Sequence, residues 1–172
     1  MSIPSCAPEL GLAREILATG GRVRLRAFGS SMLPSLWPGD VLTIEGVSCH
    51  APVPGDIVLV LHHERPFIHR VKQRQERDGR PRWITRGDAV PQSDPPVTEG
   101  ELLGKVLFIE RNRRIIVPRG RLSVSDRALA WMLCHWDRLR SVCLRMHSFR
   151  NKSALPGTAA NLVMAERRPE VS

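Results

Sequence analysis

The stretch that decides the fold is GSSMLPSLWPGD, residues 29–40. Apolar residues alternate with arginines in residues 22–27, and residues 41–44 are apolar and rich in β-branched side chains, which predicts a strand on each side of the stretch. Its two prolines fix φ and lack backbone donors, so the stretch cannot continue either strand as a central strand. It is therefore expected to be a constrained turn that presents Ser31. A simpler interpretation is that Ser30 and Ser31 only cap the turn.

Length and charge bound the class of protein. The 172 residues predict one domain of ordinary size with an appendage, large enough to bury a core without disulfides. Lys and Arg balance Asp and Glu, 13 against 13, in residues 1–110, whereas residues 111–172 carry 13 against 4 and hold the whole net charge of +9. This asymmetry indicates that the C-terminal part meets an anionic partner, unless it serves solubility alone.

The cysteines and the chain start give expectations about compartment. The four cysteines form no CxxC pair and have no histidine at zinc-ligand spacing, so we expect neither a metal site nor a disulfide framework, and no cofactor. The first residues show no basic segment followed by an apolar one, and no apolar run of about 18 residues occurs. We therefore expect reduced thiols, no classical signal peptide, no membrane span and a cytoplasmic location.

The rest of the chain up to residue 117 is expected to be mainly β. Residues 8–19 predict a helix that ends at Gly20-Gly21, and residues 73–81 and 86–99 predict a polar hairpin tip and a loop. Short strands are expected at 22–27, 41–45, 57–61, 67–72, 83–85, 104–110 and 114–117. The strand at 57–61 has no polar alternation and is expected to be buried on both faces. The predicted body is a compact β-barrel or sandwich-like unit.

The C-terminal part has a different pattern. Residues 123–150 place apolar side chains at helical spacing with arginines on the other faces, which predicts one long basic amphipathic helix. Such a helix is suited to an anionic membrane surface, and the alternative is packing on the β body with a solvated basic face. Nucleic-acid binding is not expected, because no recognised module or exposed stacking aromatics accompany the charge. The predicted units are 1–21, 22–120, 121–152 and a disordered tail at 153–172.

A serine hydroxyl near neutral pH needs a base within hydrogen-bond reach to act as a nucleophile. Of the six histidines, only His69 is expected in the middle of a strand, where alternation places it on the same face as Phe67 and Val71. A lone histidine on a strand is often purely structural, so this position by itself leaves the role of His69 open.

Six short motifs in a fixed order resemble the signal peptidase I family of serine proteases. The resemblance covers residues 22–117 and leaves out the C-terminal part. The motifs are Ser31-Met32-Leu33-Pro34, Gly39-Asp40, Pro54-Gly55-Asp56, His69-Arg70-Val71, Gly87-Asp88 with Asp94, and Gly104-Lys105-Val106. Each is weak alone, and their order over 76 residues, 31–106, makes the pattern specific.

The resemblance implies a Ser-His site. Ser31 would be the nucleophile and His69 the general base, as in the endoplasmic-reticulum and spore-former branch, whereas the housekeeping branch and the related self-cleaving repressors use lysine. Asp94 matches the residue that orients the histidine. Asp88 matches the second acidic position and is ranked second for that role, with a structural role in its loop as the alternative. Asp40 and the aspartate at 56 are expected to form turns.

The oxyanion donors and the anchor depart from the family pattern. The Ser31 backbone N–H is the first expected donor. The hydroxyl that often supplies the second donor stands two residues before the nucleophile in the family. Here that position is Gly29 and the hydroxyl is on Ser30, so the second donor stays open. The family's usual N-terminal transmembrane anchor is not expected either.

These observations predict a serine endopeptidase that cleaves an extended peptide or precursor after small residues. The alternative is a self-processing or non-catalytic regulator with the same β fold. The sequence does not predict the oligomeric state.

Overall fold

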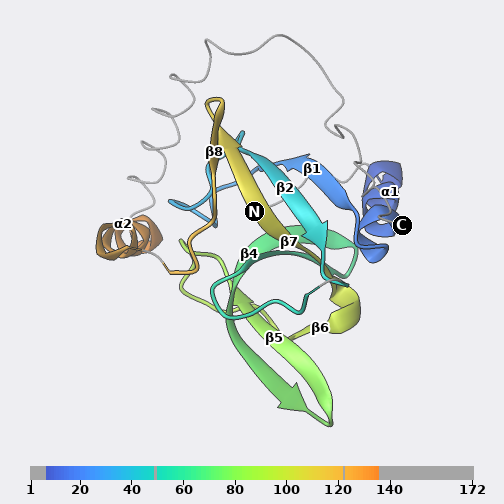
Figure 1. Cartoon of the computed structure of the whole chain (residues 1–172). Helices are drawn as coiled ribbons and strands as arrows, with labels where there is room; N and C mark the ends of the chain where they lie inside the picture. The colour runs from blue at the N-terminus through green and yellow to red at the C-terminus, as the bar shows by residue number, and fades with distance from the viewer. Residues whose placement is uncertain (1–6, 49, 122, 136–172) are drawn as a thin grey trace.

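The computed structural model describes residues 7–48, 50–121 and 123–135 (Figure 1). Within these ranges, no helix is both long and apolar enough to cross a membrane. The elements are α1 (Ala7–Ala18), β1 (Arg22–Arg26), β2 (Val41–Gly46), β3 (Ile57–His62), β4 (Arg65–Arg77), β5 (Arg80–Arg86), β6 (Val97–Thr98), the 3-10 turn η1 (Glu99–Glu101), β7 (Leu102–Arg111), β8 (Arg114–Ile116) and α2 (Val124–His135). The prediction of a mainly β protein with an N-terminal helix is confirmed.

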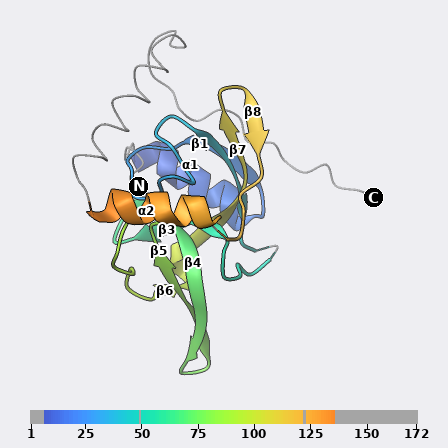
Figure 2. The same ribbon diagram turned by 90° about the vertical axis from the view of Figure 1, so that its left-hand side faces the viewer.

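The helix α1 closes one side of the core, as its apolar spacing predicts. Ala13 and Leu17 are buried, and Leu10 and Ile16 pack against the same cluster. The helix stops at Gly20, whose φ of 76° is the left-handed conformation that ends many helices. Figures 1 and 2 show α1 and α2 on opposite sides of the sheet.

The strands form one antiparallel sheet in the order β1-β2-β7-β3-β4-β5-β6, with β8 paired to β7. Three tight hairpins connect neighbours through residues with positive φ at 63–64, 78–79 and 112–113. Such turns match the twist of the strands they join. The long β4–β5 hairpin projects away from the rest of the sheet (Figures 1 and 2).

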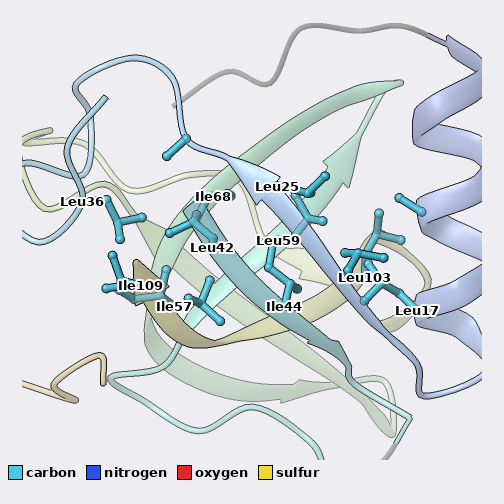
Figure 3. Packing of buried hydrophobic residues seen from close by; sticks show 14 of the residues in the cluster. Leu17, Leu25, Leu36, Leu42, Ile44, Ile57, Leu59, Ile68, Leu103 and Ile109 are labelled. Atoms are coloured by element: carbon cyan, nitrogen blue, oxygen red, sulfur yellow. The ribbon is translucent and has the colours of Figure 1, made fainter. Parts of the chain in front are cut away.

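The strand β3 is buried on both faces, as its uninterrupted apolar sequence predicts. Ile57, Leu59 and Leu61 point into the main cluster, whereas Val58 and Val60 join a second cluster with Trp83. Figure 3 shows side chains of the main cluster, which come from α1, β1, β2, β3, β4 and β7 and from the turn after β1. Because β3 lies next to β4 in the sheet, the core fixes the strand that carries His69.

Three predictions of the fold need correction. The expected barrel is an open sheet, since β1 pairs with β2 alone and β6 with β5 alone among the described residues. The hairpin tip expected at 73–81 is present but shorter, because β4 continues to Arg77, β5 begins at Arg80 and the turn is only Asp78-Gly79. Side chains exposed on both faces there hide the strand period. The expected loop at 86–99 also contains the two residues of β6.

The predicted C-terminal helix is described only from Val124 to His135. There it packs on the body, since Ala130 is buried and Leu129 contacts a small apolar cluster. The remainder of the expected helix, 136–150, and the expected disordered tail, 153–172, lie outside the described residues. The interaction of residues 123–150 with a membrane stays a prediction.

Candidate active site

The structure brings Ser31 and His69 into hydrogen-bond contact, although 38 positions separate them in sequence. Ser31 lies in the turn that follows β1, and His69 lies on β4. The Ser31 Oγ atom is 3.1 Å from His69 Nε2. The predicted pairing of serine and histidine is therefore present in the fold.

Asp94 completes a line of three side chains. Its Oδ2 atom lies 2.6 Å from His69 Nδ1 and also accepts a hydrogen bond of 2.7 Å from the Thr85 hydroxyl. A carboxylate only accepts, so the proton of a neutral His69 sits on Nδ1 and leaves Nε2 to accept from the Ser31 hydroxyl. The arrangement holds the imidazole in the tautomer that a general base requires.

Two side chains of the site are largely shielded from solvent. The side chains of His69 and Asp94 are 10% and 19% exposed. The ring of Phe67 lies on the same side of β4, with its centroid 5.0 Å from that of His69, as strand alternation predicts. Restricted solvent access strengthens the hydrogen bonds that orient the imidazole.

Gly87 lets the chain pass close to the Ser31 and His69 side chains. A Cβ atom at this position would lie 2.6 Å from the Ser31 carbonyl oxygen and 3.1 Å from His69 Nε2. This close approach explains why the first residue of the Gly87-Asp88 motif is a glycine, since any side chain there would meet both Ser31 and His69.

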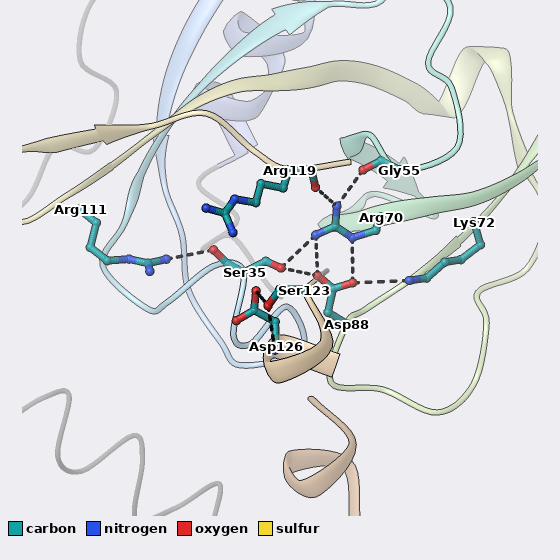
Figure 4. A network of polar contacts seen from close by, with 9 residues as sticks. All are labelled: Ser35, Gly55, Arg70, Lys72, Asp88, Arg111, Arg119, Ser123 and Asp126. Atoms are coloured by element: carbon teal, nitrogen blue, oxygen red, sulfur yellow. Dashed lines mark hydrogen bonds and ion pairs between the residues drawn. The ribbon is translucent and has the colours of Figure 1, made fainter. Parts of the chain in front are cut away.

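Asp88 does not take the orienting role that ranked second for it. Its carboxylate accepts from Arg70 Nε at 2.9 Å and Arg70 Nη2 at 2.8 Å, and from the Ser35 hydroxyl at 2.6 Å (Figure 4). Lys72 Nζ is 3.5 Å away. Asp88 thus has the structural role, although through side chains rather than through the backbone turn that the sequence suggests.

The charge balance around Asp88 shifts two pKa values. Burial would raise the pKa of the Asp88 carboxyl. The hydrogen bonds from Arg70 and Ser35, together with the positive charges of Arg70 and Lys72, outweigh burial and lower this pKa. Burial lowers the pKa of Lys72, and the charges of Arg86 and Arg70 add to this, against the opposing effect of Asp88. The Asp88 carboxylate is therefore firmly ionised beside a guanidinium that is itself buried.

The aspartates of the two earlier motifs, Asp40 and Asp56, form turns, as predicted. Asp40 Oδ2 accepts from the Trp37 backbone N–H at 2.8 Å, and Asp56 Oδ2 accepts from the Val53 N–H at 2.9 Å. Asp40 also accepts two hydrogen bonds from Arg111 of β7, at 2.9 and 2.7 Å. The end of the 29–40 stretch is thereby fixed to the sheet.

Some of the residues that build the site carry no signal in the sequence. Thr85 and Ser35 are ordinary hydroxyl residues, and only the pairing of strands and turns reveals that they bond Asp94 and Asp88. Ser30 is buried next to Ser31. The Ser31 backbone N–H and Ser30 stay predictions as oxyanion donors. Within the described part of the chain, no group of three or more His, Cys, Asp or Glu side chains could hold a metal ion.

Comparisons of the chain with known protein families, curated proteins and solved structures found no match. The functional interpretation accordingly rests on the geometry of the site and on the residues that form it.

Proposed function

We propose that the chain is a serine endopeptidase in which Ser31 is the nucleophile, His69 the general base and Asp94 the residue that orients His69. The observation that carries the proposal is the line from Ser31 Oγ to His69 Nε2 at 3.1 Å and from His69 Nδ1 to Asp94 Oδ2 at 2.6 Å. Three separate segments supply these groups. Nucleophile, base and orienting carboxylate in this order are the recognised features of acyl transfer by serine.

The reaction follows from the geometry. Nε2 of His69 takes the hydroxyl proton while Ser31 Oγ attacks the peptide carbonyl, and the resulting imidazolium returns the proton to the leaving amine. Water, activated by the same nitrogen, then hydrolyses the acyl-enzyme ester and releases Ser31. Asp94 stabilises the imidazolium and keeps its proton on Nδ1. The Ser31 N–H and Ser30 are the proposed oxyanion donors.

The pairing of β4 supports an extended peptide substrate. Residues 65–69 pair with β3, and pairing with β5 begins only at Arg70. Among the described strands, the part of β4 that ends at His69 therefore has one neighbour. A peptide added as a strand beside this segment would pass the reacting pair. The preference for small residues before the cut comes from the resemblance to signal peptidases.

Peptide turnover by matched variants tests the proposal. A fluorogenic peptide with an Ala-x-Ala sequence is expected to be cleaved by the wild type. Ser31→Ala and His69→Ala should each lower kcat by about 10⁴-fold or more. Ser48→Ala and His50→Ala are the controls, because both residues are exposed on the surface. Equal turnover by wild type and Ser31→Ala would contradict the assignment.

Intact-mass measurement separates peptide cleavage in trans from self-processing. A Ser31-dependent loss of a terminal fragment during incubation would favour the self-processing alternative. Cleavage at Gly20-Gly21 is disfavoured by the fold, because Gly21 donates to the Ile16 carbonyl and accepts from the Gly46 N–H. A stable mass together with peptide turnover supports the proposed endopeptidase.

A further inference from the structure

The helix α2 lies against two loops of the candidate site, the turn that carries Ser31 and the loop that carries Gly87. Leu33, two residues after Ser31, and Ala89, two residues after Gly87, are buried in one small apolar cluster. Leu129 of α2 and Trp37 pack on this cluster. The neighbouring Ala130 is 4% exposed, so this face of α2 is turned toward the body.

The segment that leads into α2 is fixed to the same region by polar contacts. Arg70, which follows His69, donates from Nη1 to the Arg119 carbonyl at 2.8 Å and to the Gly55 carbonyl at 2.8 Å. Gly55 has a φ of +104°, and a Cβ there would lie 2.4 Å from the Gly120 carbonyl oxygen. Figure 4 shows this network with Ser123 and Asp126 at the start of α2.

One backbone hydrogen bond joins the two loops next to Ser31. The Ala89 N–H donates to the Ser31 carbonyl at 2.9 Å. Ala89, the donor of this bond, is itself a member of the small apolar cluster, and Leu33 lies two residues after the acceptor Ser31. Leu129 packs against this cluster. Because close-packed interiors transmit small shifts, we expect a change in this cluster to displace Ser31 relative to His69, which lies on β4 beside the buried strand β3.

We infer that α2 is a positioning element of the catalytic unit and that Leu129 is a positioning residue that holds the Ser31 turn against the Gly87 loop. The inference rests on the proposed serine peptidase function and assigns a further part of the chain to it. Residues 119–121 and 123–130 then belong with the β body, although the sequence places a boundary near residue 120. A displacement of about 1 Å at reacting atoms can lower a rate about 100-fold.

Three variants test the role of Leu129. Leu129→Ala should lower kcat for peptide cleavage, and the rate of Ser31 labelling by a fluorophosphonate, by about 10-fold or more, with KM little changed. Leu129→Met keeps the apolar volume and should restore most of the rate. Leu12→Ala removes the same atoms from an exposed site on α1, where the leucine is 48% exposed, and should leave both rates unchanged. All assays are run well below the unfolding midpoint of each variant, measured by circular dichroism.

Amide hydrogen exchange provides a readout that does not depend on activity. In Leu129→Ala the Ala89 N–H should exchange faster than in the wild type, whereas amides of the core strand β3, such as Leu59, should not change. If the wild type neither cleaves peptide nor reacts with the fluorophosphonate, the proposed function fails, and the positioning role fails with it. Faster exchange at Ala89 would then show that the contact itself is real. Unchanged exchange at Ala89, or an unchanged kcat in an active enzyme, would overturn the inference.

Discussion

Asp94 uses one oxygen atom for two partners: Oδ2 lies 2.6 Å from His69 Nδ1 and 2.7 Å from the Thr85 hydroxyl. The Asp94 backbone N–H also donates to the Thr85 carbonyl at 2.9 Å, which fixes the loop to β5. Asp94 is therefore held in place through both its side chain and its backbone. This arrangement gives the loop residue Asp94 the fixed position that an orienting group needs.

Asp94→Asn should impair catalysis without changing the fold. The asparagine amide can donate to His69 Nδ1 and favour the tautomer with the proton on Nε2, so kcat should fall by about 10³ to 10⁴-fold with KM little changed. Steady-state kinetics with the Ala-x-Ala peptide measure this effect. Thr85→Val keeps the carboxylate and should cost much less. A variant Asp94→Asn with wild-type kcat would exclude Asp94 from the orienting role.

Gly87→Ala should reduce activity through steric contact alone. The added methyl would meet the Ser31 carbonyl oxygen at 2.6 Å and His69 Nε2 at 3.1 Å. Because these atoms belong to the reacting pair, kcat should fall by about 100-fold. Gly100→Ala is the matched control, since a Cβ there has no heavy atom within 4 Å. Equal activity of the two variants would show that the loop yields at Gly87.

Asp88→Asn should destabilise the fold more than it affects the reacting groups. The side chains of Arg70 and Asp88 are 5% and 0% exposed, and the substitution leaves the guanidinium buried without its counter-charge. The expected loss is about 3 to 5 kcal/mol of unfolding free energy, measured by urea denaturation. Glu45→Gln breaks the exposed pair with Arg22 and should cost less than about 1 kcal/mol. Similar losses of unfolding free energy in both variants would contradict a stabilising role of the buried Arg70–Asp88 pair.

The free energy of unfolding should fall at acidic pH when Glu101 becomes protonated. Burial would raise the pKa of its carboxyl, but hydrogen bonds from the Thr98 hydroxyl and N–H, together with the His62 contact, lower it to about 2. Because the folded pKa is below the unfolded value of about 4.3, Glu101 contributes stability above the unfolded pKa. That contribution is lost as the pH falls from about 4.3 to about 2.

Glu101→Gln measures this contribution. The variant should be less stable than the wild type at pH 6, by about 1 kcal/mol, because neutral amide contacts replace charged ones. The two proteins should converge in urea midpoint as the pH approaches 2. Glu99→Gln, at an exposed neighbour in the same turn, is the matched control and should have the stability of the wild type at pH 6. A constant gap between Glu101→Gln and the wild type down to pH 2 would rule out this origin of the acid sensitivity.

Local patterns in the sequence correctly predicted most of the β body. Alternation placed Val23 and Leu25 on the core side of β1, and the unbroken apolar run at 57–61 predicted a strand buried on both faces. These inferences succeed because burial and strand period act on neighbouring residues. The exposed residues of the β4–β5 hairpin carry no such period, so the sequence predicted the strands at 67–72 and 83–85 but not their continuation to Arg77 and back to Arg80.

By itself, the sequence determined the residue types of the candidate site, through the ordered motifs around Ser31, His69 and Asp94. The tertiary structure alone decided which aspartate faces His69, because Asp88 and Asp94 lie in one loop and only the pairing of strands turns Asp94 toward Nδ1 and Asp88 toward Arg70. It also decided that α2 packs beside the Ser31 turn. The physical reason is that hydrogen bonds and apolar contacts between distant segments depend on the position of each segment in space, which local sequence patterns do not encode.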